Sequence, residues 1–138
     1  MKRAAIIIAA AGLTLAGTAL WAQEGPRSAT PAPVVKLVKA DLPGRTVFEH
    51  QCAPCHGAGH GTDGAPVLPA VAALQRRYGG DPSPLLELRP DIEAEYVRLF
   101  VRNGVGAMPA FRKSELTDAQ VDQIAAYLRA TAKASKRK

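Results

Sequence analysis

The most regular hydrophobic pattern of the chain lies close to its C-terminal end. There, one face of a helix is outlined by apolar residues at the i, i+3, i+4 and i+7 spacing: Val121, Ile124, Ala125 and Leu128. Immediately before this stripe, Thr117 and Gln120 have the spacing of a capping box, and Leu116 and Val121 have that of a hydrophobic staple. The pattern predicts a long amphipathic helix that begins after Thr117 and buries one face.

Two shorter apolar patterns occur upstream. In the stretch PGRTVFEHQC, Pro43 stands near the start and Phe48 lies near the middle, which predicts a short helix running into the cysteine. Asp91 is a suitable N-cap for a further helix, and Gly104 is a suitable residue to end it. The buried stripe predicted for that helix consists of Ile92, Tyr96, Leu99 and Phe100.

Glycine and proline interrupt the chain between these helices. Residues 57–64 hold four glycines and therefore cannot form a stable helix. One more helix is expected near Ala70–Arg77, ended by Gly79 and Gly80. The sequence has no convincing alternating run and no β-α-β pattern. We therefore expect an all-α fold with a single domain over residues 41–131.

The N-terminal segment has the layout of an export signal. Lys2 and Arg3 precede an apolar run that extends to Trp21, and Ala22 offers a small residue for cleavage. We predict a signal peptide over residues 1–22 and export to the periplasm. An uncleaved membrane anchor is the alternative, because the run approaches the roughly 20 residues that a span needs. Residues 23–40 are rich in alanine and proline and are expected to be a linker.

The positive charge belongs largely to the two ends of the chain. Loss of residues 1–22 would lower the formal charge from +6 to +4. That remainder is matched by the basic residues of a predicted disordered tail over 132–138: Lys133, Lys136, Arg137 and Lys138. The domain itself is nearly neutral, so no nucleic-acid partner is expected. The tail is expected to be solvated or, alternatively, to dock on an acidic partner or an anionic membrane surface.

Candidate chemistry is concentrated in the stretch HQCAPCHGAGHG, which holds both cysteines of the chain. Cys52 and Cys55 have the spacing of a thiol–disulfide exchange site, and with His56 they form the Cys-x-x-Cys-His pattern of c-type haem attachment. An exchange site needs a helix that starts at the first cysteine and lowers its pKa. Here a predicted helix precedes Cys52 and a glycine-rich loop follows, so thiol exchange is the weaker hypothesis.

Two further interpretations leave part of the motif unexplained. A structural disulfide between the two cysteines would close a very short loop, stabilise little and give His56 no role. A zinc site would need four ligands, and only His50 and His60 flank the motif. The haem hypothesis uses all three residues, because two thiols can bond the vinyl groups of one porphyrin while the adjacent imidazole ligates its iron.

Met108 is a candidate for the second iron ligand. Apart from Met1 it is the sole methionine, and it lies in the loop NGVGAMPAF, whose small residues let the backbone approach a flat ligand. The alternative is that Met108 fills the core, which is the usual role of a lone methionine.

With CAPCH, GAMPAF, the short helix before and the long helix after, residues 41–131 resemble class I monohaem c-type cytochromes. The resemblance implies a small helical fold around one haem, in which the first and last helices cross. Gly44 and Phe48 would form the crossing opposite Tyr127 or Leu128.

The resemblance also implies a set of site residues. One haem c would be bound covalently by Cys52 and Cys55, and its iron would be ligated by His56 and Met108. Pro66 would lend its carbonyl to His56. Residues 67–91 contain no motif that aligns with the family, so the partners of the haem propionates stay open among Tyr78, Tyr96, Arg102 and Asn103.

Such a site implies electron transfer rather than catalysis. Residues 96–111 also resemble the cytochrome subunits of bacterial flavocytochromes such as p-cresol methylhydroxylase, which suggests a flavoprotein dehydrogenase as partner. A free soluble shuttle to a terminal oxidase is the alternative. A gas sensor or peroxidase would need an open iron position and hence a labile Met108.

Overall fold

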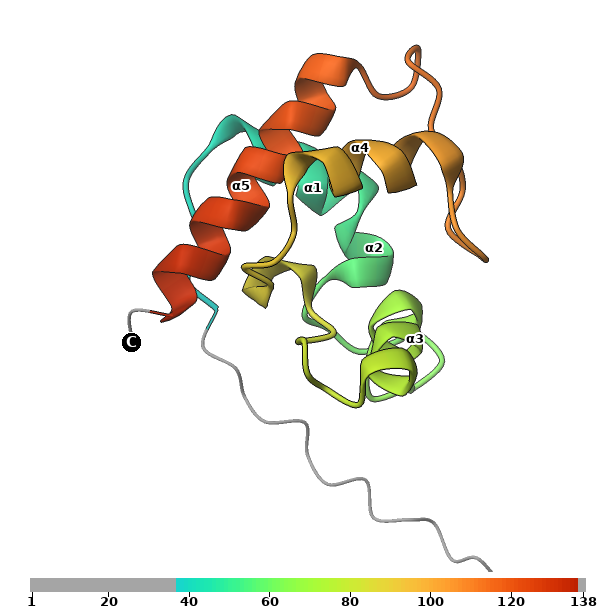
Figure 1. Ribbon diagram of the computed structural model, residues 1–138. Helices are drawn as coiled ribbons and strands as arrows, with labels where there is room; N and C mark the ends of the chain where they lie inside the picture. The colour runs from blue at the N-terminus through green and yellow to red at the C-terminus, as the bar shows by residue number, and fades with distance from the viewer. Residues whose placement is uncertain (1–36, 137–138) are drawn as a thin grey trace, which may run out of the picture.

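The computed structural model describes residues 37–136. Within this range the chain forms five α-helices and one short 3₁₀ helix, with no strand (Figure 1). They are α1 (Pro43–Gln51), α2 (Ala53–His56), α3 (Pro69–Tyr78), η1 (Leu86–Leu88), α4 (Ala94–Asn103) and α5 (Asp118–Lys136). The predicted all-α class is confirmed. The predicted signal peptide and most of the predicted linker lie outside the described residues.

Among the helices of residues 37–136, none is both long enough and apolar enough to cross a bilayer.

The centre of the fold is the crossing of α1 and α5, which are distant in sequence but pack together (Figure 1). Gly44 lies against the backbone of α5, where an added Cβ would stand 2.8 Å from the amide nitrogen of Ile124. One turn later, the Phe48 ring packs on the Tyr127 ring with centroids 5.5 Å apart, and both are fully buried. The implied crossing is confirmed, with Gly44 meeting α5 one turn before Tyr127.

Helix α4 also packs on α5 and has two apolar faces. Val97 and Val101 are buried against the core, whereas Tyr96, Leu99 and Phe100 are largely exposed. The stripe predicted from the sequence is therefore not the face that packs on α5. The start of α4 also differs from the prediction, because Asp91 pairs with Arg89 instead of capping and the helix begins at Ala94. Gly104 ends α4 as predicted, with φ of +67°.

The capping box of α5 is confirmed. The Thr117 hydroxyl accepts from the amide of Gln120 at 3.2 Å, and the Gln120 side chain accepts from the amide of Thr117 at 2.9 Å. Leu116 and Val121, the predicted staple, are both buried. Two of the orphan amides at the start of the helix thereby gain partners.

Helix α5 continues beyond the predicted end of the domain. Ala132 is fully buried and the helix extends to Lys136, so residues 132–136 are helical and the predicted disordered tail is wrong for this part. The reason is an extended segment that packs beside the helix: the amide of Val38 donates to Ser135 Oγ at 3.2 Å and that of Ala40 to Thr131 Oγ1 at 3.0 Å. The last residues of the predicted linker thus belong to the domain.

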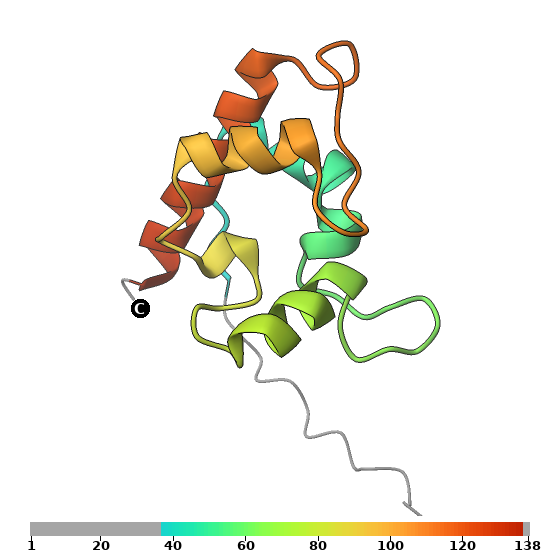
Figure 2. The same cartoon turned by 45° about the vertical axis from the view of Figure 1, so that its right-hand side comes forward.

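The remaining elements frame one region of the molecule. In Figure 2, α1, α2, α3, η1 and α4 are arranged around a common centre, with α5 along one side. Helix α3 agrees with its prediction and ends at Gly79 in the left-handed conformation. Residues 57–64 form a loop, as their glycine content predicts.

Candidate cofactor site

The two cysteines and the histidine of the motif are positioned by a short helical turn. The amide of Cys52 donates to the Phe48 carbonyl at 2.9 Å, which fixes Cys52 to the end of α1. Helix α2 then carries Cys55 and His56, and the amide of His56 donates back to the Cys52 carbonyl at 2.9 Å. Because residues i and i+4 share a face of a helical turn, the side chains of Cys52 and His56 point to the same side.

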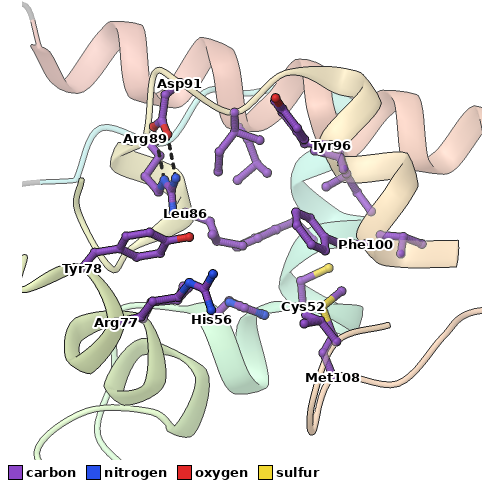
Figure 3. Close-up of a pocket in the computed structure, with 18 residues that line it drawn as sticks. Cys52, His56, Arg77, Tyr78, Leu86, Arg89, Asp91, Tyr96, Phe100 and Met108 are labelled. Carbon is purple, nitrogen blue, oxygen red and sulfur yellow. Dashed lines mark hydrogen bonds and ion pairs between the residues drawn. The ribbon is translucent and has the colours of Figure 1, made fainter. Parts of the chain in front are cut away.

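That side faces a cavity of about 580 Å³, the large cavity, shown in Figure 3. Its lining includes Cys52, His56 and Met108 and is otherwise mostly apolar, with contributions from α1, α3, η1, α4 and α5. A small cavity of about 320 Å³ shares these three residues and adds Cys55. The volume of the large cavity lies within the roughly 300–1,000 Å³ typical of cofactor and ligand sites.

Burial controls the protonation of His56. Desolvation lowers its pKa, so the imidazole is neutral at neutral pH, which is the form that ligates metals. Its Nδ1 atom is buried and has no hydrogen-bond partner among the described residues. A buried imidazole without a partner in an apolar cavity is suited to receive a further ligand or bond.

The environment of Cys52 is that of an unreactive thiol. Cys52 and Cys55 are both free, and the pKa of Cys52 is raised to about 11 by burial and, secondly, by Cys55. A thiol–disulfide exchange site requires a lowered pKa, because the thiolate is the reactive form. The environment of Cys52 therefore argues against thiol exchange.

A zinc site also finds no support in the part of the chain that the structure describes. Within residues 37–136, no three histidine, cysteine, aspartate or glutamate side chains converge to hold a metal ion. His50 and His60 are both exposed.

Met108 is held in a tight turn between α4 and α5. Val105 and Met108 exchange backbone hydrogen bonds of 3.1 and 2.9 Å, and Gly106 between them has a φ of +57°. An added Cβ on Gly104 would lie 2.5 Å from the Met108 carbonyl oxygen, so glycine is required there. The turn directs Met108 into both cavities, close to Cys52 (Figure 3).

Arg102 of α4 forms hydrogen bonds with the segment that connects α4 to α5. Its guanidinium donates to the carbonyls of Phe111 and Leu116 at 3.0 and 2.8 Å and pairs with Asp118 at 2.6 Å. Asn103 donates to the Leu99 carbonyl at 2.7 Å. Neither of these candidate propionate partners lines the large cavity, since both are engaged in the local structure.

Pro66 does not make the contact that the family resemblance implied. Its carbonyl accepts a hydrogen bond from Nδ1 of His60 at 3.0 Å rather than from His56. The physical reason is the fold of the intervening loop, in which the amide of Gly61 donates to the Ala65 carbonyl at 2.9 Å and brings His60 back onto Pro66.

Sequence reasoning missed the charged residues of the cavity. Arg77, Arg89 and Asp91 line it together with Tyr78, which was one of the open candidates. They come from α3 and from the segment after η1, where the sequence aligns with no motif. The dipeptide Arg76-Arg77 signalled basic residues on α3, but the helical pattern alone could not tell which of the two faces inward.

Comparison with known proteins gives one family. A family model described as cytochrome C oxidase, cbb3-type, subunit III matches residues 39–128, which is more than half of the chain. A solved structure described as a mutant of OmcF is 26% identical, with 67% of this chain and 98% of that chain covered and a TM-score of 0.42, too low to support a structural argument. No curated protein matches.

Proposed function

The chain belongs to the cbb3-type cytochrome c oxidase subunit III family, and from this premise we propose that it is a periplasmic electron carrier with one covalently bound haem c. Membership makes it a haem protein of electron transfer rather than an enzyme. The observation that carries the finer proposal is that Cys52, His56 and Met108 line the same cavity.

The residues of the cavity fit a haem. An apolar lining suits the porphyrin, the thiol of Cys52 lies at the cavity wall, and the buried Nδ1 of His56 lacks a partner. We assign Cys52 and Cys55 to covalent attachment and His56 and Met108 to the iron. We also propose that Pro66 supports His56. This role requires the Pro66 carbonyl to release Nδ1 of His60 and to accept a hydrogen bond from Nδ1 of His56 instead.

A bound haem supplies a one-electron couple between ferric and ferrous iron. The protein's part is to occupy the iron's ligand positions and to keep water away. A thioether from Met108 favours ferrous iron and so raises the reduction potential, while the neutral imidazole of His56 completes the pair. With both side chains committed, no open position is left for a substrate, which separates this proposal from a gas sensor or a peroxidase.

Covalent attachment is tested by haem staining after denaturing electrophoresis. Thioether bonds survive denaturation, so the wild-type band should stain and the band of Cys52→Ala/Cys55→Ala should not. His50→Ala, an exposed neighbour on α1, is the matched control and should stain. An intact mature protein with two free thiols and no haem mass would refute the assignment.

Export is supported by the signal predicted over residues 1–22 and by the fact that haem attachment to such motifs takes place outside the cytoplasm. Cell fractionation should recover the haem-stained protein with periplasmic markers, and its mass should correspond to a chain that starts at Gln23. Recovery of the full-length chain in the membrane fraction would favour the uncleaved anchor instead.

Two partners are proposed. The resemblance of residues 96–111 to flavocytochrome subunits favours a flavoprotein dehydrogenase as donor, and the family's description favours a terminal oxidase as acceptor. Gel filtration of native extract distinguishes a stable subunit from a free shuttle, because a shuttle elutes at the size of a monomer. Transient redox contacts are typically small, below about 1,200 Å².

A further inference from the structure

A group of polar side chains lies at the end of the large cavity away from Cys52 and Met108 (Figure 3). Tyr78 lies between two arginines, with its ring centroid 5.6 Å from the guanidinium carbon of Arg77 and 5.1 Å from that of Arg89. Arg77 comes from the last turn of α3, and Arg89 immediately follows η1. The large cavity therefore has the thiol of Cys52 at one end and guanidinium groups at the other.

One of the two arginines has its charge neutralised by a carboxylate, and the other does not. Arg89 forms a two-point ion pair with Asp91, at 3.2 and 2.6 Å, and only 13% of its side chain is exposed. Arg77 forms no ion pair or side-chain hydrogen bond with any residue in the range 37–136. The net positive charge at this end of the cavity is thus that of Arg77.

The two edges of a haem carry groups that match the two ends of the large cavity. Its vinyl groups, which the cysteines bond, and its two propionate carboxylates lie on different parts of the porphyrin rim. Guanidinium groups bind carboxylates with paired hydrogen bonds and remain charged at every physiological pH. The apolar middle of the cavity and its polar end follow the same order as the cofactor.

We infer that Arg77, Tyr78 and Arg89 form the site of the haem propionates, with Arg77 supplying the uncompensated positive charge. This inference rests on the proposed function. It assigns the propionate contacts to the segment in which the sequence has no recognisable motif, and it excludes Arg102 and Asn103, which do not line the large cavity.

The assignment has an electrostatic consequence of defined sign. A positive charge beside the cofactor stabilises the reduced state, which carries one positive charge fewer than the oxidised state. Arg77→Gln should therefore lower the reduction potential. Asp91→Asn removes the carboxylate that neutralises Arg89, so it should raise the potential.

The test is spectroelectrochemical titration of the haem-loaded protein at one pH and low salt. Arg76→Gln is the matched control, because it removes the same charge from the adjacent residue of α3, which does not line the cavity. Arg77→Gln is expected to shift the potential downward by clearly more than Arg76→Gln, Asp91→Asn to shift it upward, and Arg77→Lys to restore most of the wild-type value.

Equal shifts for Arg77→Gln and Arg76→Gln would overturn the role of Arg77, and an unchanged or lowered potential in Asp91→Asn would overturn that of Arg89. Circular dichroism of each variant shows whether the helices are intact, and Asp91→Asn, whose expected shift is upward, decides whether this site acts on the haem if Arg77→Gln does not fold. A wild-type protein without covalent haem would instead refute the proposed function, so the two failures are distinguishable.

Discussion

Gly44 of α1 and Gln123 of α5 approach so closely that the space for a side chain at Gly44 is filled by the Gln123 backbone. A Cβ built on Gly44 would overlap the Gln123 carbonyl and lie 2.8 Å from the next amide nitrogen. The neighbouring Phe48–Tyr127 contact depends on this approach, because the same two helices carry both pairs. The crossing in turn holds Cys52, at the end of α1, beside the large cavity.

Gly44→Ala should destabilise the protein although alanine is the better helix former. The added methyl group forces α1 away from α5, and such overpacking typically costs about 1–3 kcal/mol. Denaturant unfolding of the haem-loaded protein measures the change. Gly59→Ala is the control, since a Cβ there meets only Leu68 at an ordinary 3.7 Å. Equal stability of the two variants would contradict a tight crossing.

Met108→Leu should remove the sulfur–iron charge-transfer band of the oxidised protein and lower its reduction potential. Leucine keeps the volume and apolar character of the side chain, so packing alone should change the stability by less than about 1.5 kcal/mol. The near-infrared spectrum and carbon monoxide binding report the vacated ligand position. Ala110→Leu, a change of the same loop outside both cavities, should keep the band. A band that persists in Met108→Leu would assign Met108 to the core.

Tyr127→Phe should destabilise the fold without disturbing the ring packing on Phe48. The Tyr127 hydroxyl donates to the carboxylate of Glu87, and both residues are fully or almost fully buried. Burial and the Glu87 carboxylate raise the pKa of Tyr127, so the phenol remains a donor over the whole physiological range. Lys39 Nζ, 3.9 Å from Glu87, is too distant to take over the hydrogen bond.

A hydrogen bond to a buried charged group contributes about 1.5–3 kcal/mol, and a loss of this size is expected in denaturant unfolding of Tyr127→Phe. Tyr96→Phe provides the control, because Tyr96 is 56% exposed. If both variants unfold at the wild-type midpoint, the Glu87–Tyr127 contact has no net effect on stability.

Asp118→Asn should alter the acid stability of the protein. Hydrogen bonds from Lys113 and then Arg102 lower the pKa of Asp118 from 3.8 to about 2. Because the pKa is lower in the folded state, the stabilisation is present above about pH 4 and is lost as the pH falls from about 4 to about 2. The wild type should thus exceed Asp118→Asn in stability at pH 6 but not at pH 2.

Thermal unfolding across this pH range checks the Asp118 prediction, with Glu95→Gln in the first turn of α4 as control. The difference should shrink at high salt, since the pair is exposed to solvent. A difference between wild type and Asp118→Asn that stays constant down to pH 2 would contradict it.

Several helix boundaries could be predicted because they depend on local signals in the sequence. The capping box at Thr117 and the glycine that ends α4 are decided within a few residues of sequence. The face of α4 could not be predicted, since Leu99 and Phe100 on one face are as apolar as Val97 and Val101 on the other. Only the position of α5 decides which pair is buried in the core.

The candidate site shows the same division. Cys52, His56 and Met108 were found from motif and loop chemistry, and the structure brings them to one cavity. Arg89 and Asp91 were missed as cavity residues because their ion pair depends on a turn that no motif marks. The same ion pair keeps Asp91 from capping α4, so the helix begins later than predicted. Glu87 could not be foreseen as buried, because its partner Tyr127 lies 40 residues away in the sequence.

The segment of Val38 and Ala40 runs antiparallel to the end of α5. Val38 bonds Ser135, whereas Ala40, further along the chain, bonds the earlier residue Thr131. The two ends of the described chain therefore leave the domain at the same corner. If the two ends were pulled apart, the force would break the Val38–Ser135 hydrogen bond first and the Ala40–Thr131 hydrogen bond second. The two bonds would not share the force, as they would if the segments were pulled along each other. The domain should thus yield first at this corner, while the packed crossing of α1 and α5 at the cavity still bears no load.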